Sequence, residues 1–367
     1  MIRPVLLVSH GFQPNYEKAF ANGLARNNLP VTVVTSERSL VDEFDSRIRV
    51  VPLRGSQDPR RAPLTKAWTL LAYIVKLYVF LATYPRGALH LTGMFLTASV
   101  PLGLVELTSY RVLSRRLLLT VHNLLPHDQH TWLNKIIFRL IYRIPDRLVV
   151  HTEKMRDTLV AEWGIAPQRV VVMEHGVDDL PATVAPWKPD PANRLRLLMF
   201  GSVSRYKGID IALDALQGIM DFPVTLEIVG ACRDSVYAAE LDAMIAAIPA
   251  PHRVTWQRGY VAENEVQQIF EYADAVLLPY RHIDQSGVLL TSYRFGIPVL
   301  AFAVGAFPEY VTFDTGMVLA DKSVPGLRKG IRELRANLGR FDRNQVRSFA
   351  RQYLWENTVR VLLPHYG

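Results

Sequence analysis

Two kinds of hydrophobic segment alternate along the first half of the chain. Short apolar runs bounded by turn residues, which are typical of buried strands, occupy residues 5–8, 31–35, 88–91, 116–121, 147–151 and 170–173. Longer segments of helical length occupy residues 16–26, 64–84, 94–111, 135–143 and 153–163. This alternation predicts a doubly wound parallel sheet with helices on its faces.

The same alternation begins again after residue 193. Strands are predicted over 195–200, 224–229, 254–257, 275–278 and 299–302, and helices over 209–217, 237–247, 265–272, 286–295 and 344–363. Residues 180–193 contain four prolines and no apolar periodicity, which indicates a linker. We therefore predict an α/β protein with Rossmann-like domains over 1–180 and 194–343, a linker over 181–193 and a final helix over 344–367.

Composition and charge narrow the class of protein. The 367 residues are 49% hydrophobic and 21% charged, which excludes a disordered chain and suits two globular domains. The single cysteine, Cys232, excludes an internal disulfide and predicts a small buried side chain in a reducing cytosol. The net charge of +8 indicates an anionic partner. Residues 68–84 are apolar but short for a bilayer span and contain Lys76, so we expect a buried helix.

A loop and a helix start in the second half predict an anion site. Ser286, Gly287 and Val288 begin a helix directly after a predicted strand and loop. Such a helix N-terminus presents free backbone N–H groups and a partial positive charge to an anion such as a diphosphate. Arg205 and Lys207 precede another helix and can neutralise a diphosphate leaving group. The alternative is a solvated turn with two incidental cations.

The predicted strand over 116–121 ends in a cluster of polar side chains. His122, Asn123, His127 and Asp128 follow it within a few residues. Asp128 can act as a general base, and His122 or His127 can orient or polarise a sugar hydroxyl. Two alternatives stay open: a loop in which Asp128 caps a helix, and a zinc site, although no cysteine lies nearby.

These motifs resemble the GT-B glycosyltransferases of the GT4-like group. Asp284 falls at the first acidic position of that group's nucleotide-sugar signature and Gly287 at its turn, whereas Ser292 replaces the second acidic residue. The resemblance implies that Asp284 contacts the donor sugar and that Lys207 grips the phosphates. Ser292 can hydrogen-bond a ribose hydroxyl but is not a carboxylate. Two alternatives stay open: the ribose is held in another way, or the chain belongs to a divergent branch with altered donor geometry. The resemblance also implies that the turn at Gly11 lets the donor approach the first domain.

The resemblance extends to the nucleotide base and to the acceptor. It implies that the backbone of Gly259 and Tyr260 reads the base, and that His151 and His175 end strands lining the cleft. The pattern over 120–128 resembles a subset of bacterial exopolysaccharide transferases that includes the β-mannosyltransferase of xanthan assembly. The implied protein is a GT-B enzyme, with two Rossmann-like β/α domains facing a central cleft.

The implied reaction is hexosyl transfer without a metal or cofactor. The donor is a nucleoside-diphosphate sugar, a UDP- or GDP-sugar, and the acceptor is a polyprenyl-diphosphate-linked saccharide at the inner face of the plasma membrane. Lys135, Arg139 and Arg143 share one helix face, which predicts contact of a cytoplasmic protein with an anionic membrane surface. The alternative for that face is a core helix with a solvated cationic side.

Other functions stay open on the same pattern. The second acidic residue of the signature is a glutamate in the family, and its replacement by Ser292 favours a non-catalytic GT-B-like binding module. A sugar-nucleotide epimerase or a phosphorylase is a further alternative on the same fold. Neither half has Gly-x-Gly-x-x-Gly after its first strand, which disfavours a NAD-dependent dehydrogenase. Nucleic-acid binding is not indicated, because the sequence shows no interleaving of aromatic and cationic residues and no RNP or zinc-finger motif.

Overall fold

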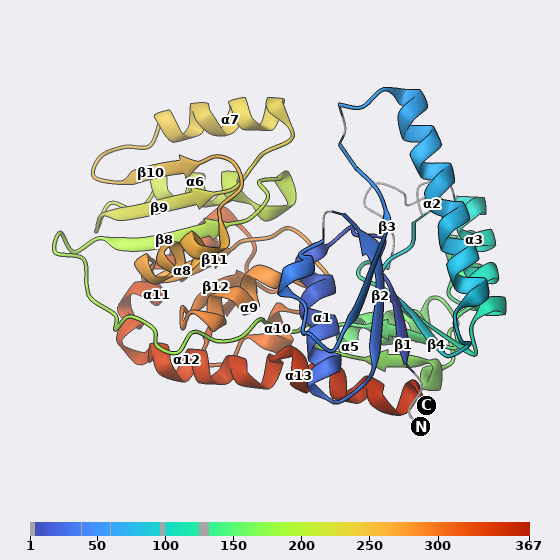
Figure 1. The fold of residues 1–367 in the computed structure, drawn as a ribbon. Coiled ribbons are helices and arrows are strands. Elements are labelled where there is room, and N and C mark those ends of the chain that lie inside the picture. The colour runs from blue at the N-terminus through green and yellow to red at the C-terminus, as the bar shows by residue number, and fades with distance from the viewer. Residues whose placement is uncertain (1–3, 38, 59, 96–99, 125–131) are drawn as a thin grey trace. The chain divides into compact units, whose positions relative to one another are not determined.

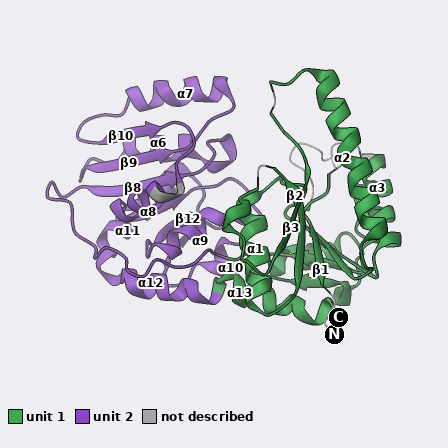
Figure 2. Cartoon of the chain, viewed as in Figure 1, with its two compact units in different colours: residues 1–176, 353–367 green, residues 177–352 purple. Residues whose placement is uncertain are grey.

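The chain folds into two compact units. The structure is a computed structural model that describes residues 4–37, 39–58, 60–95, 100–124 and 132–367 (Figure 1). Unit 1 comprises Met1–Gly176 together with Tyr353–Gly367, and unit 2 comprises Val177–Gln352 (Figure 2). The last segment of the chain therefore belongs to the same unit as the first.

Unit 1 is built on a parallel sheet. Within the described residues this sheet has seven strands in the order β3-β2-β1-β4-β5-β6-β7. The strands are β1 (Val5–Val8), β2 (Val31–Ser36), β3 (Arg49–Arg54), β4 (Ala88–Leu91), β5 (Arg116–Thr120), β6 (Arg147–Val150) and β7 (Val170–Val172). The helices are α1 (Pro14–Arg26), α2 (Pro63–Thr83), α3 (Val100–Leu113), α4 (Trp132–Ile141), α5 (Glu153–Ala161) and α13 (Trp355–Thr358). The predicted strand–helix alternation is confirmed, and β3 is an addition to it.

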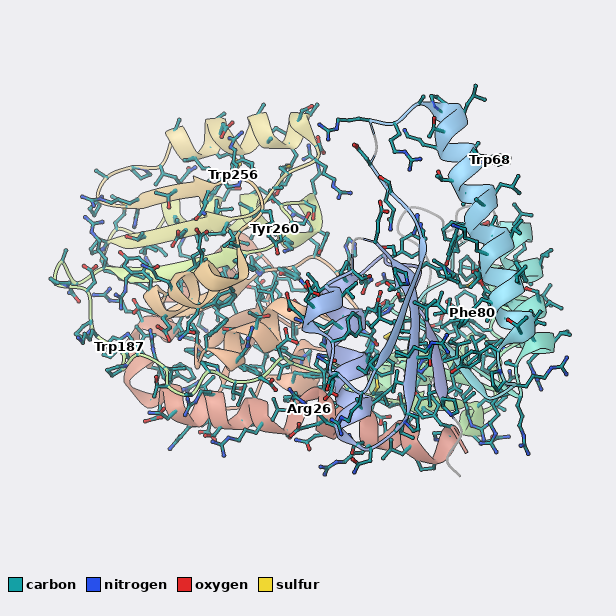
Figure 3. All side chains as sticks on the ribbon, in the orientation of Figure 1. Arg26, Trp68, Phe80, Trp187, Trp256 and Tyr260 are labelled. Atoms are coloured by element: carbon teal, nitrogen blue, oxygen red, sulfur yellow. The ribbon has the colours of Figure 1, made fainter. Side chains whose placement is uncertain are left out.

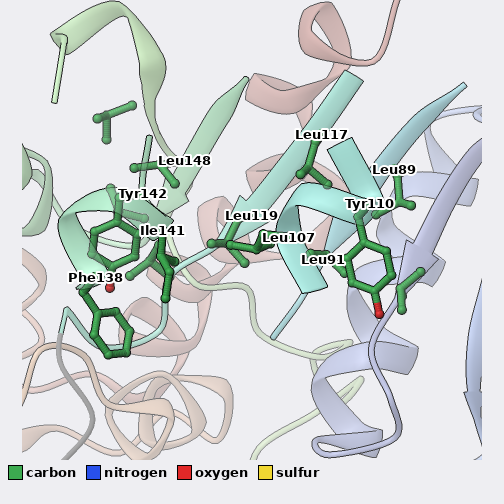
Figure 4. Close-up of a cluster of buried hydrophobic side chains, with 14 of the residues drawn as sticks. Leu89, Leu91, Leu107, Tyr110, Leu117, Leu119, Phe138, Ile141, Tyr142 and Leu148 are labelled. Carbon is green, nitrogen blue, oxygen red and sulfur yellow. The ribbon is translucent and has the colours of Figure 1, made fainter. Parts of the chain in front are cut away.

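Two apolar clusters cover the two faces of the unit 1 sheet. Successive strand residues point to opposite faces, so Leu6 and Val8 join one cluster and Val5 and Leu7 the other. The first cluster contains buried residues of α2, α3 and α4, and Figure 4 shows part of it, with Tyr110 of α3 among the labelled residues. Burial on both faces explains why these strands read as continuous apolar runs.

The end of the chain differs from the single helix predicted over 344–363. The structure has α12 (Arg343–Phe349), α13 and a 3₁₀ helix Val359–His365, and the extended backbone of Leu354 interrupts the sequence of turns. Trp355 packs where Gly23 and Gly176 leave room, since a Cβ on Gly176 would overlap the Trp355 ring. The predicted single helix is therefore wrong: the segment is divided into short helices, of which α12 belongs to unit 2, whereas α13 and the 3₁₀ helix belong to unit 1.

Unit 2 repeats the architecture with another parallel sheet. In the part of it that is described, six strands run in the order β10-β9-β8-β11-β12-β13. The strands are β8 (Leu195–Phe200), β9 (Val224–Val229), β10 (Arg253–Gln257), β11 (Ala275–Leu278), β12 (Val299–Phe302) and β13 (Gly316–Leu319). The helices are α6 (Ile209–Gln217), α7 (Ser235–Ala246), α8 (Glu263–Tyr272), α9 (Gly287–Arg294), α10 (Phe307–Tyr310), α11 (Val324–Ala336) and α12.

The proline-rich segment predicted as a linker is bound to unit 2. The indole Nε1 of Trp187 donates to Asp274 at 2.8 Å. Arg347 donates to the carbonyl oxygens of Pro181 at 2.9 Å and Ala182 at 2.7 Å. The segment therefore follows the surface of one unit although it carries no regular secondary structure.

Two burial predictions are wrong. Cys232 is half-buried, and its Sγ donates to the carbonyl oxygen of Asp234 at 3.2 Å. The helix α2, predicted to be buried, has only 17% of its most apolar 18-residue window buried. Tyr73, Leu77 and Leu81 pack on the sheet, whereas much of the remaining surface of α2 is exposed.

Candidate functional site

A buried lysine lies at the carboxyl end of β8. Lys207 ends the 3₁₀ helix Arg205–Lys207, and its side chain is only 6% exposed. Its Nζ donates to the carbonyl oxygen of Phe200 at 2.8 Å and lies 5.6 Å from the ring centroid of Tyr280. Burial lowers the pKa of Lys207 to about 8. A desolvated ammonium with so few polar contacts strongly attracts an anion.

Glycines bring this ammonium close to the start of α9. Gly208 has φ +67°, and a Cβ there would overlap the carbonyl oxygen of Pro279. Gly201 has φ +89°, and a Cβ there would lie 2.9 Å from Lys207 Nζ and 3.6 Å from Val288 Cγ2. The lysine and the first turn of α9 are therefore neighbours around one glycine, and a side chain there would crowd the Lys207 ammonium.

The N-terminus of α9 is open. A Cβ on Gly287 would meet no atom within 4 Å, and Ser286 makes no side-chain capping bond to the helix. The Ser286 hydroxyl instead bonds to Tyr280. The side-chain oxygen of Gln285 is buried here and has no hydrogen-bond partner within the described residues. The N–H groups of the first turn and the Lys207 ammonium thus form a positively polarised space, and this is the space for which the sequence predicts an anion.

Arg205 is directed to a different element. Its guanidinium pairs with Glu240 at 2.8 Å and Asp234 at 3.7 Å, and it lies 4.5 Å from the ring centroid of Tyr237. The hydrogen bond that Arg205 donates to Glu240 raises the pKa of Arg205. The charge of Arg205 is therefore already balanced by α7, and the structure separates its role from that of Lys207 although the two residues are close in sequence.

Asp284 and Ser292 have contrasting surroundings. Ser292 has no exposed surface, and its hydroxyl donates to the carbonyl oxygen of Ile297 at 2.6 Å. It stabilises the end of α9 and offers no accessible group to a ribose. Asp284 is half-buried, and its carbonyl oxygen accepts a hydrogen bond from Ala306 N at 3.1 Å. The loop before α9 is thereby held against the turn that precedes α10.

The loop after β10 exposes an aromatic ring. Gly259 has φ +109°, and Tyr260 is 87% exposed (Figure 3). An exposed aromatic ring beside a glycine turn can stack on a planar ligand. These are the two residues predicted to read the nucleotide base.

In unit 1, histidines follow four strands of the sheet. His10 follows β1, His122 follows β5, His151 follows β6 and His175 follows β7. The ring centroids of His122 and His151 are 5.3 Å apart, and those of His151 and His175 are 5.4 Å apart. The ring of Tyr16 packs against these three histidines at 4.8–6.0 Å. The carboxyl edge of the sheet therefore carries a contiguous cluster of imidazoles.

Burial favours the neutral imidazole of His122, His151 and His175. It lowers the pKa of His175 to about 4, that of His151 well below its usual value, and that of His122 in the same direction. The Nε2 of His122 lies 2.8 Å from the carbonyl oxygen of Thr92. Because a carbonyl oxygen only accepts hydrogen bonds, Nε2 carries the proton and Nδ1 is the basic nitrogen. His122 is thus an oriented proton acceptor.

His122 lines a cavity of about 520 Å³ at this edge. The cavity wall is mainly apolar and aromatic, with a few polar groups, and consists of Ser9, Phe12, Gln13, Thr92, Gly93, Met94, Phe95, Leu119, Thr120, Val121, His122, Asn123, Phe138 and Tyr142. Such a wall suits a ligand with both apolar and hydroxyl-bearing parts. The other two predicted catalytic residues, His127 and Asp128, lie outside the described residues.

The turn at His10 and Gly11 has a structural explanation. Gly11 has φ +68°, and a Cβ there would overlap the hydroxyl of Ser36. His10 is fully buried, with Nδ1 2.5 Å from the Tyr73 hydroxyl and Nε2 3.5 Å from Glu106 Oε1. Sequence reasoning missed this buried network, because Tyr73 and Glu106 lie far along the chain on α2 and α3.

The described residues contain no group of three or more His, Cys, Asp or Glu side chains that could hold a metal ion. The expectation of a metal-independent reaction stays a prediction.

Profiles of known protein families match the sequence of each unit. The profile of "Glycosyltransferase Family 4" matches residues 15–179, and that of "Glycosyl transferases group 1" matches residues 194–337. A GDP-mannose:glycolipid 4-β-D-mannosyltransferase of Xanthomonas campestris is 30% identical over 189 residues, which are 50% of this chain and 48% of the relative. A D-inositol 3-phosphate glycosyltransferase of Mycolicibacterium gilvum is 28% identical over 233 residues, 60% of this chain and 52% of the relative. The chain thus spans about half the length of these curated relatives.

Solved structures share the fold over nearly the whole chain. Sucrose-phosphate synthase from Thermosynechococcus elongatus has a TM-score of 0.75 at 17% identity, covering 99% of this chain and 97% of that one. Anabaena HepE in complex with UDP-glucose has a TM-score of 0.71 at 17% identity, covering 98% and 96%. The two parallel sheets with alternating helices agree with these solved structures. The two matching profiles together span most of the sequence. The chain therefore belongs to the family 4 and group 1 glycosyltransferases and has the GT-B fold.

Proposed function

We propose that this chain transfers a hexose from a nucleoside-diphosphate sugar to a lipid-linked saccharide. The observation that carries the proposal is the buried Lys207 ammonium beside the open N-terminus of α9. The donor diphosphate would occupy the space in front of Gly287, where backbone N–H groups and the ammonium point at one anion. The family to which the chain belongs supports transfer over the non-catalytic alternative.

Lys207 would act on the leaving group. When the bond between the anomeric carbon and the diphosphate oxygen breaks, negative charge builds on that oxygen. A preorganised cation in a desolvated position stabilises this charge more than it stabilises the ground state. The buried side-chain oxygen of Gln285 would accept a hydrogen bond from an N–H or O–H group of the nucleotide sugar. This bond would give the oxygen the partner that it lacks within the described residues.

The remaining donor contacts follow from the loops around this space. Tyr260 would stack on the base, with Gly259 allowing close approach of the backbone, and Asp284 would contact the donor sugar. Ser286 and Val288 would contribute backbone N–H groups with Gly287. Neither Arg205 nor Ser292 is part of this proposed contact set, because both are engaged within unit 2.

On the acceptor side, His122 would take the proton of the attacking hydroxyl. Its Nδ1 is the basic nitrogen, the Thr92 carbonyl oxygen fixes the ring orientation, and the cavity that it lines provides room for a saccharide. Asp128 and His127 remain candidates for the same proton transfer or for orienting the acceptor. In this scheme no step uses a metal ion or a cofactor.

The choice of donor and acceptor draws on the relatives. The Xanthomonas campestris relative is named for GDP-mannose and a glycolipid, and Anabaena HepE was crystallised with UDP-glucose. We therefore propose a GDP- or UDP-sugar as donor and a polyprenyl-diphosphate-linked saccharide as acceptor, in exopolysaccharide or cell-surface glycan synthesis. Such an acceptor would place the protein at the cytoplasmic face of the plasma membrane as a peripheral protein.

The test is a calorimetric titration of the protein with GDP, UDP, ADP and TDP, followed by sugar transfer to a membrane extract. We expect one nucleotide to bind, and Lys207→Ala to lose that binding while Lys188→Ala, a change of an exposed lysine of the same unit, retains it. If no nucleotide binds, or if Lys207→Ala binds and turns over like the wild type, the proposed function is wrong.

A further inference from the structure

One side of α2 exposes a stripe of large apolar side chains. Leu64 is 85% exposed, Trp68 71%, Leu71 53%, Val75 54% and Val79 58%. They are spaced by three or four residues, and at 100° per residue they fall on one side of the helix. Figure 3 shows Trp68 on α2. We refer to these five residues as the outer stripe.

The flank, the inner side and the C-terminal end of α2 are fixed to unit 1. The Tyr78 hydroxyl lies 2.6 Å from Ser109 Oγ of α3, the Tyr84 hydroxyl donates to Thr32 at 2.9 Å, and Tyr73 bonds to His10. By length and composition α2 could cross a membrane. These polar bonds hold it against the sheet, however, so lipid cannot surround it. The outer stripe is exposed and available to another phase or molecule.

A helix on the surface of a water-soluble domain normally carries polar residues on its outer side. The outer stripe is apolar along its whole length, and α3, which lies beside α2 in Figure 1, adds Leu102, Val105 and Val112 as exposed apolar side chains. An apolar surface of this extent indicates a site of association.

The charges near the outer stripe favour an anionic bilayer over a second copy of the chain as the partner of this surface. Between Asp58 and Glu106 the sequence has no acidic residue, and its cations there are Arg60, Arg61, Lys66, Lys76 and Arg86. A second copy of the chain docked stripe to stripe would bring these like charges together. An anionic bilayer accepts apolar side chains at its acyl boundary and cations at its headgroups, and Trp68 has the amphipathic ring that favours this interface.

We propose that the outer stripe of α2, with the adjoining apolar residues of α3, is the surface by which unit 1 lies on an anionic phospholipid bilayer. The axis of α2 lies in the plane of the interface. The inference rests on the proposed function, because contact with a bilayer would bring the protein to a lipid-linked acceptor. It assigns the apolar contact to α2 and α3, whereas the sequence alone indicated the cationic face of residues 135–143.

The test compares two triple variants in vesicle co-sedimentation. Trp68→Glu with Leu71→Glu and Val75→Glu puts three negative charges on the outer stripe. Met220→Glu with Val236→Glu and Phe313→Glu makes the same charge change at apolar side chains of unit 2 that are also exposed. Vesicles of phosphatidylcholine with and without phosphatidylglycerol are the probes, without donor or acceptor.

We expect the wild type and the unit 2 variant to bind the phosphatidylglycerol vesicles. The α2 variant should bind them roughly 100-fold more weakly, because three apolar side chains no longer enter the interface. Lys66→Gln with Lys76→Gln should weaken binding by about tenfold and reduce its dependence on salt. Circular dichroism and calorimetric nucleotide binding establish that each variant is folded.

Equal vesicle binding by the wild type and the α2 variant overturns the inference. So does a wild-type dimer that the α2 variant converts to a monomer while vesicle binding is unchanged, because a second copy then occupies the stripe. If vesicle binding depends on the stripe but no nucleotide binds, the proposed function fails and the membrane surface stands. If a nucleotide binds but vesicle binding does not depend on the stripe, only the membrane surface fails.

Discussion

Burial at the carboxyl edges of the two sheets lowers pKa values in both units but leaves groups of different charge. In unit 2, burial lowers the pKa of Lys207 from 10.5 to about 8, which leaves a cation at neutral pH. In unit 1, burial lowers the pKa of His175 from 6.5 to about 4, and those of His122 and His151 in the same direction, which leaves neutral bases. Desolvation penalises the charged form in both cases. One edge therefore suits an anion, and the other suits a hydroxyl that must lose a proton.

The largest expected effect follows from removing the cation. Lys207→Ala should lower kcat/KM for sugar transfer by roughly 1,000-fold, because a preorganised charge facing the leaving group is lost. Steady-state kinetics with the donor that binds in calorimetry measures it, and Lys188→Ala is the control. A loss of less than tenfold would show that the ammonium does not face the leaving group.

Removing the base in unit 1 should have a different signature. His122→Gln should lower kcat by about 100-fold, because proton transfer to an oriented imidazole is lost. Donor affinity should stay within twofold of the wild type, since the donor contacts lie in unit 2. Isothermal calorimetry and initial rates separate the two quantities, and unchanged kcat in His122→Gln would transfer the role of base to another group, with Asp128 the next to test.

Filling the space before α9 tests where the anion binds. Gly287→Val adds a side chain where a Cβ meets no protein atom within 4 Å, so the fold should tolerate it while nucleotide affinity falls by about tenfold or more. Gly339→Val is the matched control, because a Cβ there also meets nothing within 4 Å. Thermal unfolding should be alike in both variants, and equal nucleotide affinity in the two would contradict the site.

The pH dependence of donor binding sharpens the contrast between the edges. Lys207 is protonated below its pKa of about 8 and loses its charge as pH rises through that value. A bound diphosphate favours the charged form, so affinity is full below about 8 and should fall by about tenfold per pH unit above it. Lys207→Arg should bind with little pH dependence in this range, because a guanidinium stays protonated. An unchanged profile in that variant would assign the titration to another group.

The smallest expected effect concerns the second cation of the loop. Arg205→Ala should change kcat/KM by less than about threefold, because its guanidinium is exposed and already paired with Glu240 and Asp234. The same kinetic assay measures it. A loss as large as that of Lys207→Ala would mean that Arg205 leaves α7 to contact the donor.

Much of the fold follows from local pattern. Every predicted strand is present, and for most of them the reason is that strands buried on both faces must be continuous apolar runs whatever surrounds them. The strand β3 escaped notice because it is mostly half-exposed and contains Pro52. The helix α11 and the strand β13 were also not predicted. The residues of the candidate anion site could be named in part from the sequence, since the glycines and Lys207 are close in sequence to the strand end that positions them.

Burial and protonation depend on residues far apart in the chain. Arg205 and Lys207 share a loop, yet Lys207 donates to Phe200 of β8 beside the Tyr280 ring, while Arg205 pairs with Glu240 of α7. The resemblance predicted a ligand contact for Ser292, but the carbonyl oxygen of Ile297 accepts its hydroxyl inside the fold. The outer side of α2 reads as core in the sequence and is exposed in the structure. Hydrophobic pattern sets which segments become strands and helices because it acts locally, whereas charge state and accessibility arise from packing between distant segments, which changes the solvation of each group.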